Sequence, residues 1–240
     1  MDISIVIPAF EENKKIGRDV EAASVFLKSN NLAGEIIIVD DGSSNGTAKA
    51  AEKVEVPAGT VLKVVRLPRH RGKGCAIRSG IKQTSGEYVM FADCGCCVPY
   101  ENVLDGLKLL KSGVCDIAHG SRKIPGSNIL RSQSWYRRVC ARIFHWFIVY
   151  AMKIPAELTD TQCGFKIYKG EVGRKLYREC VTDGFMFDVE IIMRALKQGL
   201  RIKEFPIEWS CDSDSRLSPA RSLWRFSSEL ITIKRMLSKE

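Results

Sequence analysis

The sequence lacks any apolar run long enough to cross a bilayer, for which about 20 residues are needed. Its longest apolar block, IFHWFIVYAM at 143–152, has half that length and contains a histidine. The N-terminal stretch ISIVIP is too short for a secretory leader and is followed at once by acidic residues. Internal repeats and low-complexity linkers are also absent from the sequence. We therefore expect a globular protein that is neither exported nor membrane-spanning.

Acidic residues are in deficit, with 28 against 37 basic ones and a net charge of +9. This balance suits an anionic partner, whether nucleic acid, anionic lipid or a phosphorylated substrate, and composition does not choose among them. A chain of 240 residues with 45% hydrophobic content fits one α/β domain. Without export, its nine cysteines are expected to be reduced thiols.

Short β-branched runs alternate with helical periodicity over the first 120 residues. We expect strands at 4–8, 35–40, 61–67 and 88–93, and helices at 13–30, 45–54, 73–84 and 100–112. This order predicts a doubly wound, mostly parallel sheet with right-handed crossovers. Ligands of such sheets bind at the carboxyl ends of the strands, here residues 8–12, 40–44, 68–73 and 93–97.

The second half has a different character. Aromatic and arginine residues are dense over 129–154, and a helical run FDVEIIMRALKQGL, a strand RIKEFPIEW and an amphipathic tail at 219–237 follow. Aromatics alternate with arginine at 135–150, and the tail carries an apolar stripe of Leu223, Phe226, Leu230, Ile233 and Leu237. Both patterns are typical of helices that lie on a bilayer, and core packing is the alternative for either.

Two strand-end motifs suit a nucleotide. IVDDGSSNGT at 38–47 has two carboxylates that could bind a ribose or base edge, and a Ser/Thr cluster that could cap the next helix. PRHRGKGCAIRSG at 68–80 surrounds two glycines with cations, and glycines at a helix start let backbone N–H groups approach an anion. The alternatives are a capped turn with solvated acids and a solvated basic loop.

A third strand end, within EYVMFADCGCCVPYE at 87–101, places Asp93 before Cys94, Cys96 and Cys97. The cysteine spacing fits no usual Cys-x₂-Cys zinc pair, and thiolates are poor ligands for Mg²⁺. Small apolar packing is the ordinary role of free cysteine, and we expect it here.

The motifs IVIPAFEEN, IVDDGSSNGT, RGKGCAIRSG and TDTQCGFKIY, with a strand ending at Asp93, occur in the order found in family 2 glycosyltransferases. The sequence most resembles the polyprenyl-phosphate sugar synthases, which make dolichyl-phosphate mannose or glucose, from residue 3 to about 210. The resemblance implies a GT-A fold, a UDP- or GDP-sugar donor, and inverting transfer of one sugar to a lipid phosphate at the cytosolic membrane face.

The resemblance also assigns donor-side residues. Pro8, Ala9 and Glu12 match the nucleotide-binding turn, Asp40 and Asp41 the acids that hold the nucleoside, and Lys73 the lysine of the basic loop. Asp93 matches the first acid of the Asp-x-Asp metal motif, but Gly95 stands where the second acid belongs. Mg²⁺ or Mn²⁺ would then be held by Asp93, the donor diphosphate and main-chain carbonyls of residues 94–97.

The acceptor decides whether a general base is needed. A phosphate monoester is already mostly dianionic at neutral pH, so it needs cations and no base. We expect its phosphate to be held by Arg122, Arg131, Arg137 and Arg138, with Arg142 on the same helix face as Arg138, although a solvated charged face is the alternative.

The resemblance places acceptor- and sugar-side contacts at Asp160, Thr161 and Gln162. Asp188 and Glu190 could bind sugar hydroxyls, or act as helix N-terminal acids. The predicted catalytic set is Asp93, Arg122, Asp160, Gln162 and Asp188. His119 and His145 are expected to be structural, and Trp209 to wall the site or fill core.

We thus expect a single domain with a donor half at 1–120, an acceptor half at 121–218 and a C-terminal amphipathic helix at 219–238. We expect the protein to bind the cytoplasmic face of a membrane peripherally. A membrane-anchoring subunit is a possible partner, and nucleic acid is not expected as one. Two alternatives remain: a family 2 transferase with a hydroxyl acceptor and Asp188 or Asp160 as base, and a non-catalytic nucleotide-sugar-binding subunit.

Overall fold

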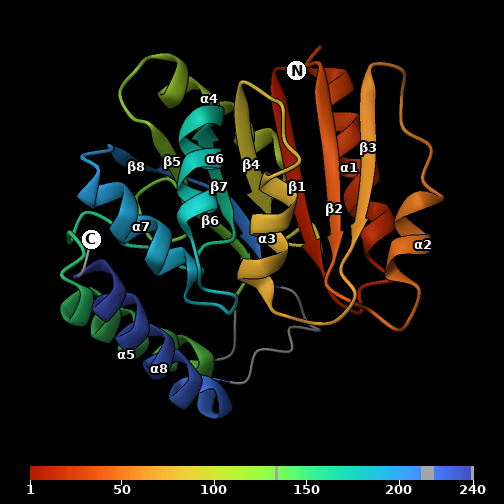
Figure 1. Ribbon diagram of the computed structural model, residues 1–240. Coiled ribbons are helices and arrows are strands. Elements are labelled where there is room, and N and C mark those ends of the chain that lie inside the picture. The colour runs from red at the N-terminus through yellow and green to blue at the C-terminus, as the bar shows by residue number, and fades with distance from the viewer. Residues whose placement is uncertain (133–134, 212–218, 239–240) are drawn as a thin grey trace.

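The computed structural model describes residues 1–132, 135–211 and 219–238, and only the backbone of Arg137, Ala141 and 219–225. Within these ranges a seven-stranded sheet has the order β3-β2-β1-β4-β7-β5-β8 (Figure 1). Its strands are β1 (Ile3–Ala9), β2 (Gly34–Asp40), β3 (Thr60–Arg66), β4 (Tyr88–Ala92), β5 (Ile117–Ser121), β7 (Phe165–Lys169) and β8 (Ile202–Pro206). Only β7 runs antiparallel to its neighbours, β4 and β5. The predicted mixed, mostly parallel sheet is confirmed.

Helices cover both faces of the sheet (Figure 1). One face is covered by α1 (Ile16–Ser29), α2 (Thr47–Glu52) and α4 (Val103–Lys111), which a short 3₁₀ turn (Tyr100–Asn102) precedes. The other is covered by α3 (Lys73–Ile81), α6 (Gly170–Glu179) and α7 (Phe187–Lys197). Strands buried on both faces are mostly apolar, which is why β1 and β2 contain the hydrophobic runs IVIPA and IIIV.

Alternate residues of β1 pack on opposite faces of the sheet. Ile5 and Ile7 belong to the core under α1, whereas Val6 belongs to the core under α3. Gly80 lets α3 lie close to the sheet, since a Cβ there would be 2.5 Å from Cγ1 of Val6. Helix α3 ends at Ile81, before the predicted residue 84, and the Thr84 hydroxyl donates to the Ile81 carbonyl at 2.6 Å.

The predicted strand RIKEFPIEW is two strands in two sheets. It divides into β8 and β9 (Glu208–Ser210), and β9 pairs in parallel with β6 (Asn128–Arg131). The prediction of one strand is wrong because Pro206, the last residue of β8, has no N–H with which to continue the ladder. The break carries Trp209 away from the main sheet.

A third core joins the helices α5 (Trp135–Met152) and α8 (Pro219–Leu237), which lie side by side in Figure 1, to α7. Phe226, Leu230 and Ile233 of α8 are all buried there. The expectation that this stripe lies on a bilayer is wrong for these residues, and core packing is their role. The side chain of Leu223 lies outside the described residues.

Candidate active site

The carboxyl ends of β2, β1 and β4 lie together at one edge of the sheet, because these strands are adjacent and parallel. From β1 the chain proceeds to β2 and β3 on one side and returns to β4 on the other. Open α/β sheets bind ligands at such a switch point. The residues that follow there are the turn after Ala9, Asp40 with Asp41, and Asp93.

Pro8 and Ala9 are the last residues of β1, and the turn that follows is tied to the loop after β2. The Glu11 N–H donates to the Ser43 hydroxyl at 2.8 Å, and the Glu12 N–H donates to the Thr47 hydroxyl at 2.9 Å. The prediction that this Ser/Thr cluster caps the next helix is wrong, because α2 begins after Gly46 with no side-chain cap. These hydroxyls instead fix the turn that is predicted to bind the nucleotide.

Asp40 and Asp41 are both buried, and both accept backbone N–H groups. Asp40 accepts from Ser43 at 2.9 Å. Asp41 accepts from Arg71 at 2.9 Å and from Gly72 at 2.7 Å, and its carboxylate also lies 2.8 Å from the His70 imidazole. Asp41 thus holds the basic loop at 68–73, and a role for either acid in holding a nucleoside stays a prediction.

The glycines of the basic loop serve close packing of backbone on backbone. The N–H groups of Gly74 and Cys75 donate at 3.2 Å to the carbonyls of Gly184 and Asp183, in the loop before α7. A Cβ on Gly74 would lie 2.4 Å from the carbonyl oxygen of Thr182. The prediction that these N–H groups are open to an anion is wrong, because protein carbonyls already accept them.

Lys73 and Asp93 form the ion pair at the centre of this edge, with Nζ 2.6 Å from Oδ1. Burial lowers the pKa of Lys73, but the charges of Asp93 and Asp188 outweigh it and leave the pKa above its usual value. Asp93 is packed so closely against Gly164 that a Cβ there would overlap its carboxylate. The lysine is therefore a fixed positive charge beside the predicted metal ligand.

The loop after Asp93 is held by Asp19, a fully buried residue of α1 that the sequence interpretation missed. Its carboxylate accepts the N–H of Gly95 at 2.9 Å and that of Cys96 at 2.8 Å. Arg18 donates to the Gly95 carbonyl at 3.3 Å. The available signal was that Asp19 lies three residues after Ile16, on the buried face of its helix.

The thiols of Cys94 and Cys96 also lie against Asp19, with Sγ 3.2 and 3.3 Å from its oxygens. Burial first, and then the Asp19 charge, raises the pKa of Cys96 to about 12 and that of Cys94 further. Both are therefore protonated at neutral pH. Within the described part of the chain, no group of three His, Cys, Asp or Glu residues could hold a metal ion.

The implied divalent cation can still use Asp93. Mg²⁺ commonly takes one or two protein carboxylates and completes its shell with phosphate oxygens and water. The Asp93 side chain is 39% exposed at the strand end, so it fits as one such ligand. The Gly95 and Cys97 carbonyls, which were expected to help, already accept hydrogen bonds from Arg18 and from the Ser210 N–H.

Asp188 forms a buried ion pair with Lys166, with Oδ1 2.6 Å from Nζ. Lys166 also donates to the carbonyls of Thr161 and Cys163, at 3.2 and 2.8 Å. Burial raises the pKa of Asp188, and Lys166 and Lys73 only partly oppose this. Asp188 is thus enclosed between two lysines and 3% exposed, which disfavours it as a base that reaches an acceptor.

Glu190 is fully buried and caps the loop before α7. Its carboxylate accepts the N–H groups of Val181 and Thr182, at 3.0 and 2.8 Å, and pairs with Arg194 at 2.9 Å. The suggestion that it binds sugar hydroxyls is wrong, because these contacts occupy it.

Asp160 and Arg122 form a two-point ion pair beside Trp209. Arg122 donates from Nε and Nη2 to the two Asp160 oxygens, at 2.7 and 2.8 Å, and its guanidinium lies 5.2 Å from the Trp209 ring centre. Burial raises the pKa of Asp160, but Arg122 outweighs it and brings the pKa to about 2. A carboxylate with such a pKa is a weak general base.

Thr161 and Gln162 follow this pair, and polar atoms of both are buried. Among the described residues, the Thr161 hydroxyl and Gln162 Nε2 have no hydrogen-bond partner. Nearby, a pocket lies between the loop after Asp93 and the strand β9, and Asp93, Cys96, Cys97, Cys163, Gly164 and Trp209 line it together with apolar neighbours. The structure thus brings the predicted metal ligand to one pocket with Trp209, the ring against which Arg122 lies.

The other predicted phosphate-binding arginines belong to two elements, β6 and α5. Arg131 is an exposed residue of β6, in register with Ser210 of β9, whereas Trp209 is in register with Ile129. Arg138 and Arg142 are exposed on α5, and the charge of Arg142 contributes to lowering the pKa of Lys123, after burial and Arg122. The Arg137 side chain lies outside the described residues.

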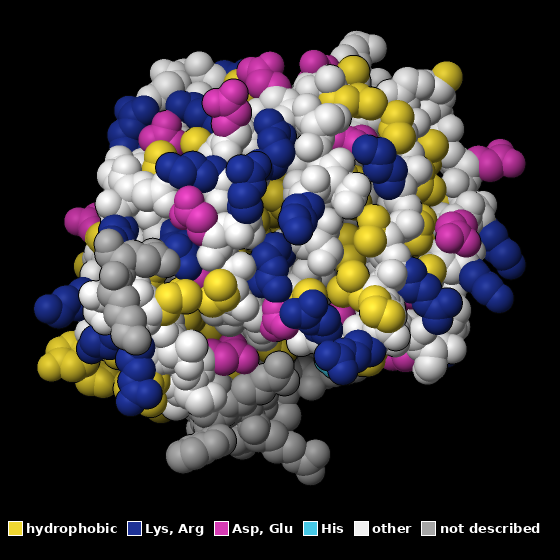
Figure 2. Space-filling model, in the orientation of Figure 1, with side chains coloured by type: hydrophobic (Ala, Val, Ile, Leu, Met, Phe, Trp, Pro, Cys, Tyr) yellow, Lys and Arg dark blue, Asp and Glu magenta, His cyan; other side chains and the backbone are white. Residues whose placement is uncertain are grey.

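One face of α5 is apolar and exposed. Exposed fractions are 71% for Trp135, 48% for Val139, 63% for Ile143, 66% for Trp146 and 75% for Tyr150, at helical spacings of four, four, three and four. Hydrophobic side chains protrude over α5 at the lower left of Figure 2, whereas Lys and Arg gather between α6 and α3. Among the described residues, no helix combines the length and apolar character required to cross a membrane.

The sequence of residues 4–176 matches the family model described as Glycosyl transferase family 2. Curated relatives include proteins named dolichyl-phosphate β-glucosyltransferase. The one from Dictyostelium discoideum is 28% identical over 97% of this chain and 73% of its own length. The human one is 29% identical over 97% of this chain and 74% of its own.

Solved structures share the fold at lower identity. Glucosyl-3-phosphoglycerate synthase from Mycobacterium tuberculosis, in complex with Mn²⁺, UDP-glucose and phosphoglyceric acid, has a TM-score of 0.71 at 19% identity, over 97% of this chain and 78% of that one. Mannosyl-3-phosphoglycerate synthase from Rubrobacter xylanophilus has a TM-score of 0.68 at 16% identity, over 100% and 74%. These likenesses establish the fold.

Proposed function

The chain belongs to glycosyl transferase family 2, and from that premise we propose that it transfers one sugar from a nucleotide-sugar donor to a polyprenyl or dolichyl phosphate. It has the GT-A fold and is a glycosyltransferase; the donor type, the acceptor and the membrane face are the proposal. Relatives named dolichyl-phosphate β-glucosyltransferase favour glucose as the sugar and dolichyl phosphate as the acceptor.

The observation that carries the phosphate acceptor is that both acids considered as bases are bound by cations. Asp160 is held at two points by Arg122, and Asp188 lies against Lys166. A hydroxyl acceptor needs a base to remove its proton, whereas a phosphate monoester is already dianionic. The cations next to Asp160 are Arg122 and Lys123, and in this proposal they hold the acceptor phosphate.

In this proposal the acceptor phosphate oxygen attacks the anomeric carbon, and the bond from that carbon to the donor diphosphate breaks. The nucleoside diphosphate leaves with the electron pair, so negative charge grows on it. Lys73, half-buried and charged next to Asp93, would stabilise that charge. Mg²⁺ or Mn²⁺ bound at Asp93 would supply further electrostatic stabilisation of the leaving group.

The donor-side turn and loops belong to the same proposal. Glu12, Asp40 and Asp41 lie at the ends of β1 and β2, where the nucleoside is expected, and hydrogen bonds fix their loops before any ligand arrives. A prearranged loop reduces the ordering cost of binding.

A lipid acceptor also requires access to a membrane. The exposed aromatic face of α5 suits the interface between water and lipid, where Trp and Tyr are favoured, and the exposed Arg138 and Arg142 suit anionic headgroups. We assign this face a peripheral contact with the cytoplasmic side of a membrane. A membrane-anchoring partner would serve the same purpose.

The test is transfer of radiolabelled sugar into lipid extract from UDP-glucose or GDP-mannose, with dolichyl phosphate and Mn²⁺ or Mg²⁺ present. We expect incorporation that depends on the lipid phosphate and is lost in Asp93→Asn. Transfer to a dephosphorylated polyprenol at the same rate would refute the phosphate acceptor. Failure to use any nucleotide sugar would instead favour a non-catalytic binding subunit.

A further inference from the structure

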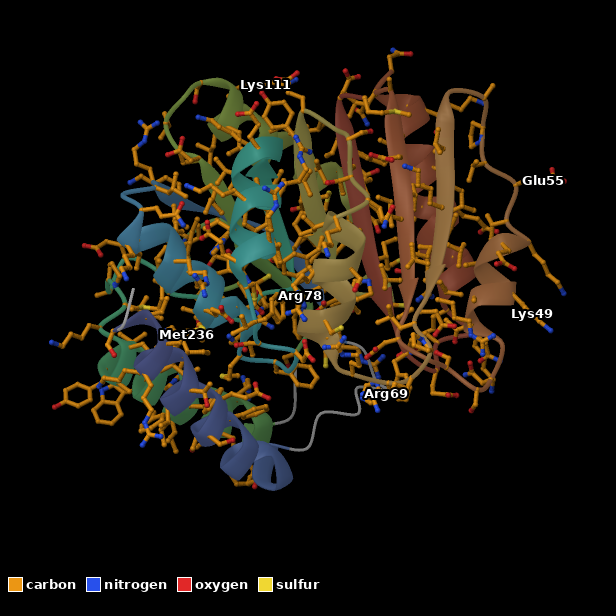
Figure 3. All side chains as sticks on the ribbon, in the orientation of Figure 1. Lys49, Glu55, Arg69, Arg78, Lys111 and Met236 are labelled. Carbon is orange, nitrogen blue, oxygen red and sulfur yellow. The ribbon has the colours of Figure 1, made fainter. Side chains whose placement is uncertain are left out.

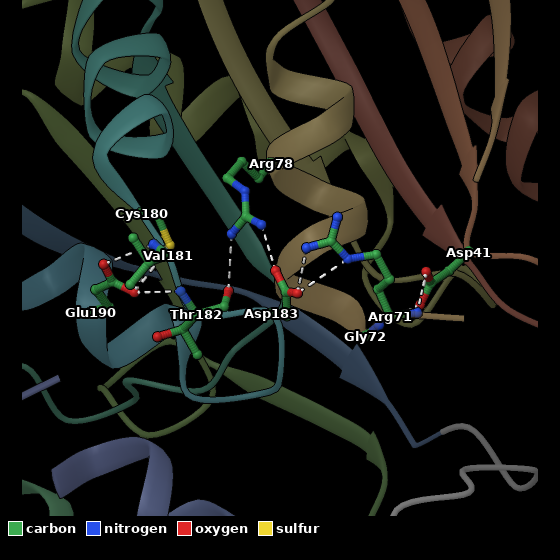
Figure 4. Close-up of polar contacts among 9 residues, drawn as sticks. All are labelled: Asp41, Arg71, Gly72, Arg78, Cys180, Val181, Thr182, Asp183 and Glu190. Atoms are coloured by element: carbon green, nitrogen blue, oxygen red, sulfur yellow. Dashed lines mark hydrogen bonds and ion pairs between the residues drawn. The ribbon is translucent and has the colours of Figure 1, made fainter. Parts of the chain in front are cut away.

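Asp183 joins two arginines across the edge of the sheet. It lies in the loop between α6 and α7, and its Oδ2 accepts hydrogen bonds from Arg71 Nε at 3.2 Å and Nη2 at 2.7 Å, while Oδ1 accepts from Arg78 Nη2 at 2.5 Å (Figure 4). Arg78 points from α3 toward this loop (Figure 3). Burial raises the pKa of Asp183, but the arginines outweigh it, so the carboxyl has a lowered pKa and is ionised at neutral pH.

The backbone of the same loop clasps the start of α3. The carbonyls of Asp183 and Gly184 accept the N–H groups of Cys75 and Gly74, both at 3.2 Å. A Cβ on Gly72 would lie 2.5 Å from the Asp183 carbonyl oxygen, so the two segments touch without room for a side chain. Side chain and backbone of Asp183 thus act on the same turn.

Both ends of this connection are themselves anchored (Figure 4). On the donor side, Asp41 at the end of β2 accepts the N–H groups of Arg71 and Gly72. On the other side, the buried Glu190 of α7 accepts those of Val181 and Thr182. Asp183 therefore lies at the middle of a continuous series of contacts that runs from β2 to α7.

Lys73 is the residue that this series places. It follows Gly72 directly and is the first residue of α3, and its ammonium group lies 2.6 Å from Asp93. The position of that charge depends on where the first turn of α3 lies, which the Asp183 loop and Asp41 fix from two sides. A shift of about 1 Å in such a group can reduce a rate about 100-fold.

We propose that Asp183 is a positioning residue for glycosyl transfer: by holding Arg71 and Arg78 it fixes the first turn of α3, so that Lys73 lies against Asp93 at the donor edge. This inference rests on the proposed function. It assigns a structural role to Arg71 and Arg78, which from the basic-loop motif alone would be expected to bind a phosphate.

The kinetic test compares Asp183→Asn with Asp116→Asn. Asp116 likewise binds two cations, Lys169 at 2.7 Å and Arg201 at 3.4 Å, but it precedes β5 and so lies at the opposite edge of the sheet. We expect Asp183→Asn to lower kcat by about tenfold or more while the KM for the donor changes less, because Lys73 acts on charge that develops during transfer. Asp116→Asn should retain kcat, and Asp183→Glu should recover part of the loss. Equal kcat values in Asp183→Asn and Asp116→Asn would overturn the proposal.

A second measurement does not depend on activity. In hydrogen exchange followed by mass spectrometry, amides of residues 71–75 should exchange faster in Asp183→Asn and at the wild-type rate in Asp116→Asn. Unchanged protection would refute the positioning role even if the protein transfers sugar. If the wild type transfers no sugar, the proposed function fails, and the exchange result still decides the placement. Should Asp183→Asn not fold, Arg78→Lys, which cannot span both Asp183 and the Thr182 carbonyl in the same way, takes its place in both measurements.

Discussion

The carboxylate of Asp19 accepts the backbone N–H of Gly95, with both of its oxygens within 3.0 Å of the nitrogen. Gly95 stands where family 2 relatives of this type are expected to carry the second acid of a metal motif. Its φ of +106° belongs to a backbone region that side chains rarely adopt. The loop after Asp93 is thus built around an acid contributed by α1.

Restoring the motif by Gly95→Asp should not improve metal binding. A side chain at this φ is strained by about 1–3 kcal/mol, and the new carboxylate would lie in the loop that Asp19 already makes negative. We expect a lower melting temperature and no tighter Mn²⁺ binding in a calorimetric titration. Gly59→Asp is the matched control, because its φ is +91° and a Cβ there meets nothing within 4 Å. Stronger Mn²⁺ binding by Gly95→Asp would show that the loop tolerates the missing ligand.

Removing the Asp19 carboxylate should loosen the same loop. In Asp19→Ala the partly buried N–H groups of Gly95 and Cys96 lose their acceptor, at a cost of at most about 1–3 kcal/mol for each group left unpaired. The Cys96 pKa should also fall, since the Asp19 charge is, after burial, the main cause of its rise. Urea unfolding measures the first effect, and the rate of iodoacetamide alkylation between pH 7 and 9 measures the second. Alkylation no faster than in the wild type would contradict this account.

The strands, and the fact that their carboxyl ends lie together, could be predicted because local patterns determine them. Apolar β-branched runs ending in Pro8, Asp40 and Asp93 indicate buried parallel strands whose ends meet. The sequence could not indicate which polar and charged side chains are already occupied by hydrogen bonds or ion pairs within the protein. Asp19 lies 76 residues before Gly95 in the chain, and Asp183 lies 112 residues after Arg71, so neither pairing has a local signal.

Two wrong predictions in the acceptor half, the bilayer contact of the α8 stripe and sugar binding by Glu190, have the same physical origin. An amphipathic stripe is the same in sequence whether protein or lipid covers it, and only the packing of α5 and α7 showed that Phe226 is buried. Similarly, an acid at a helix start reads alike whether it is open to a substrate or, like Glu190, enclosed by backbone N–H groups.

Arg122 and Asp160 should differ in their effects on the lipid substrate. Arg122→Met removes the cation expected to hold the acceptor phosphate, so we expect the KM for dolichyl phosphate to rise at least tenfold with little change in the KM for the donor. Asp160→Asn keeps the cation but loosens it, and should give a smaller rise of the same kind. If Asp160 were instead the base, its variant would lower kcat and remove an acid limb from the pH–rate profile.

Protonation of His119 should make the protein less stable in mild acid. His119 is 1% exposed, and among the described residues neither ring nitrogen has a hydrogen-bond partner. It is in register with Lys166 on one side and Glu204 on the other. Burial, and then the Lys166 charge, lowers its pKa well below 6.5, with Asp160 opposing.

Because the unfolded chain takes up this proton near pH 6.5 and the folded chain does not, stability is unaffected above that pH and falls as the pH drops below it. The slope for one proton is about 1.4 kcal/mol per pH unit. We expect urea unfolding between pH 7.5 and 5 to show this fall in the free energy of unfolding in the wild type. The same free energy should depend less on pH in His119→Leu. His145→Gln should remove less of this pH dependence than His119→Leu does, since the His145 imidazole is only partly buried. An unchanged slope in His119→Leu would assign the effect to other groups.

The exposed face of α5 should bind lipid independently of catalysis. Trp146 and Tyr150 stack with ring centres 5.7 Å apart while most of each side chain faces solvent, an arrangement that presents a flat aromatic surface at little ordering cost. We expect the double variant Trp146→Ala, Tyr150→Ala to bind vesicles of anionic phospholipid at least tenfold more weakly in a sedimentation assay. Transfer to a water-soluble, short-chain polyprenyl phosphate should be retained. Leu104→Ala, which removes an exposed apolar side chain from α4, is the control and should bind as the wild type does. Equal vesicle binding by all three proteins would mean that this face meets another protein and that lipid reaches the site by a different surface.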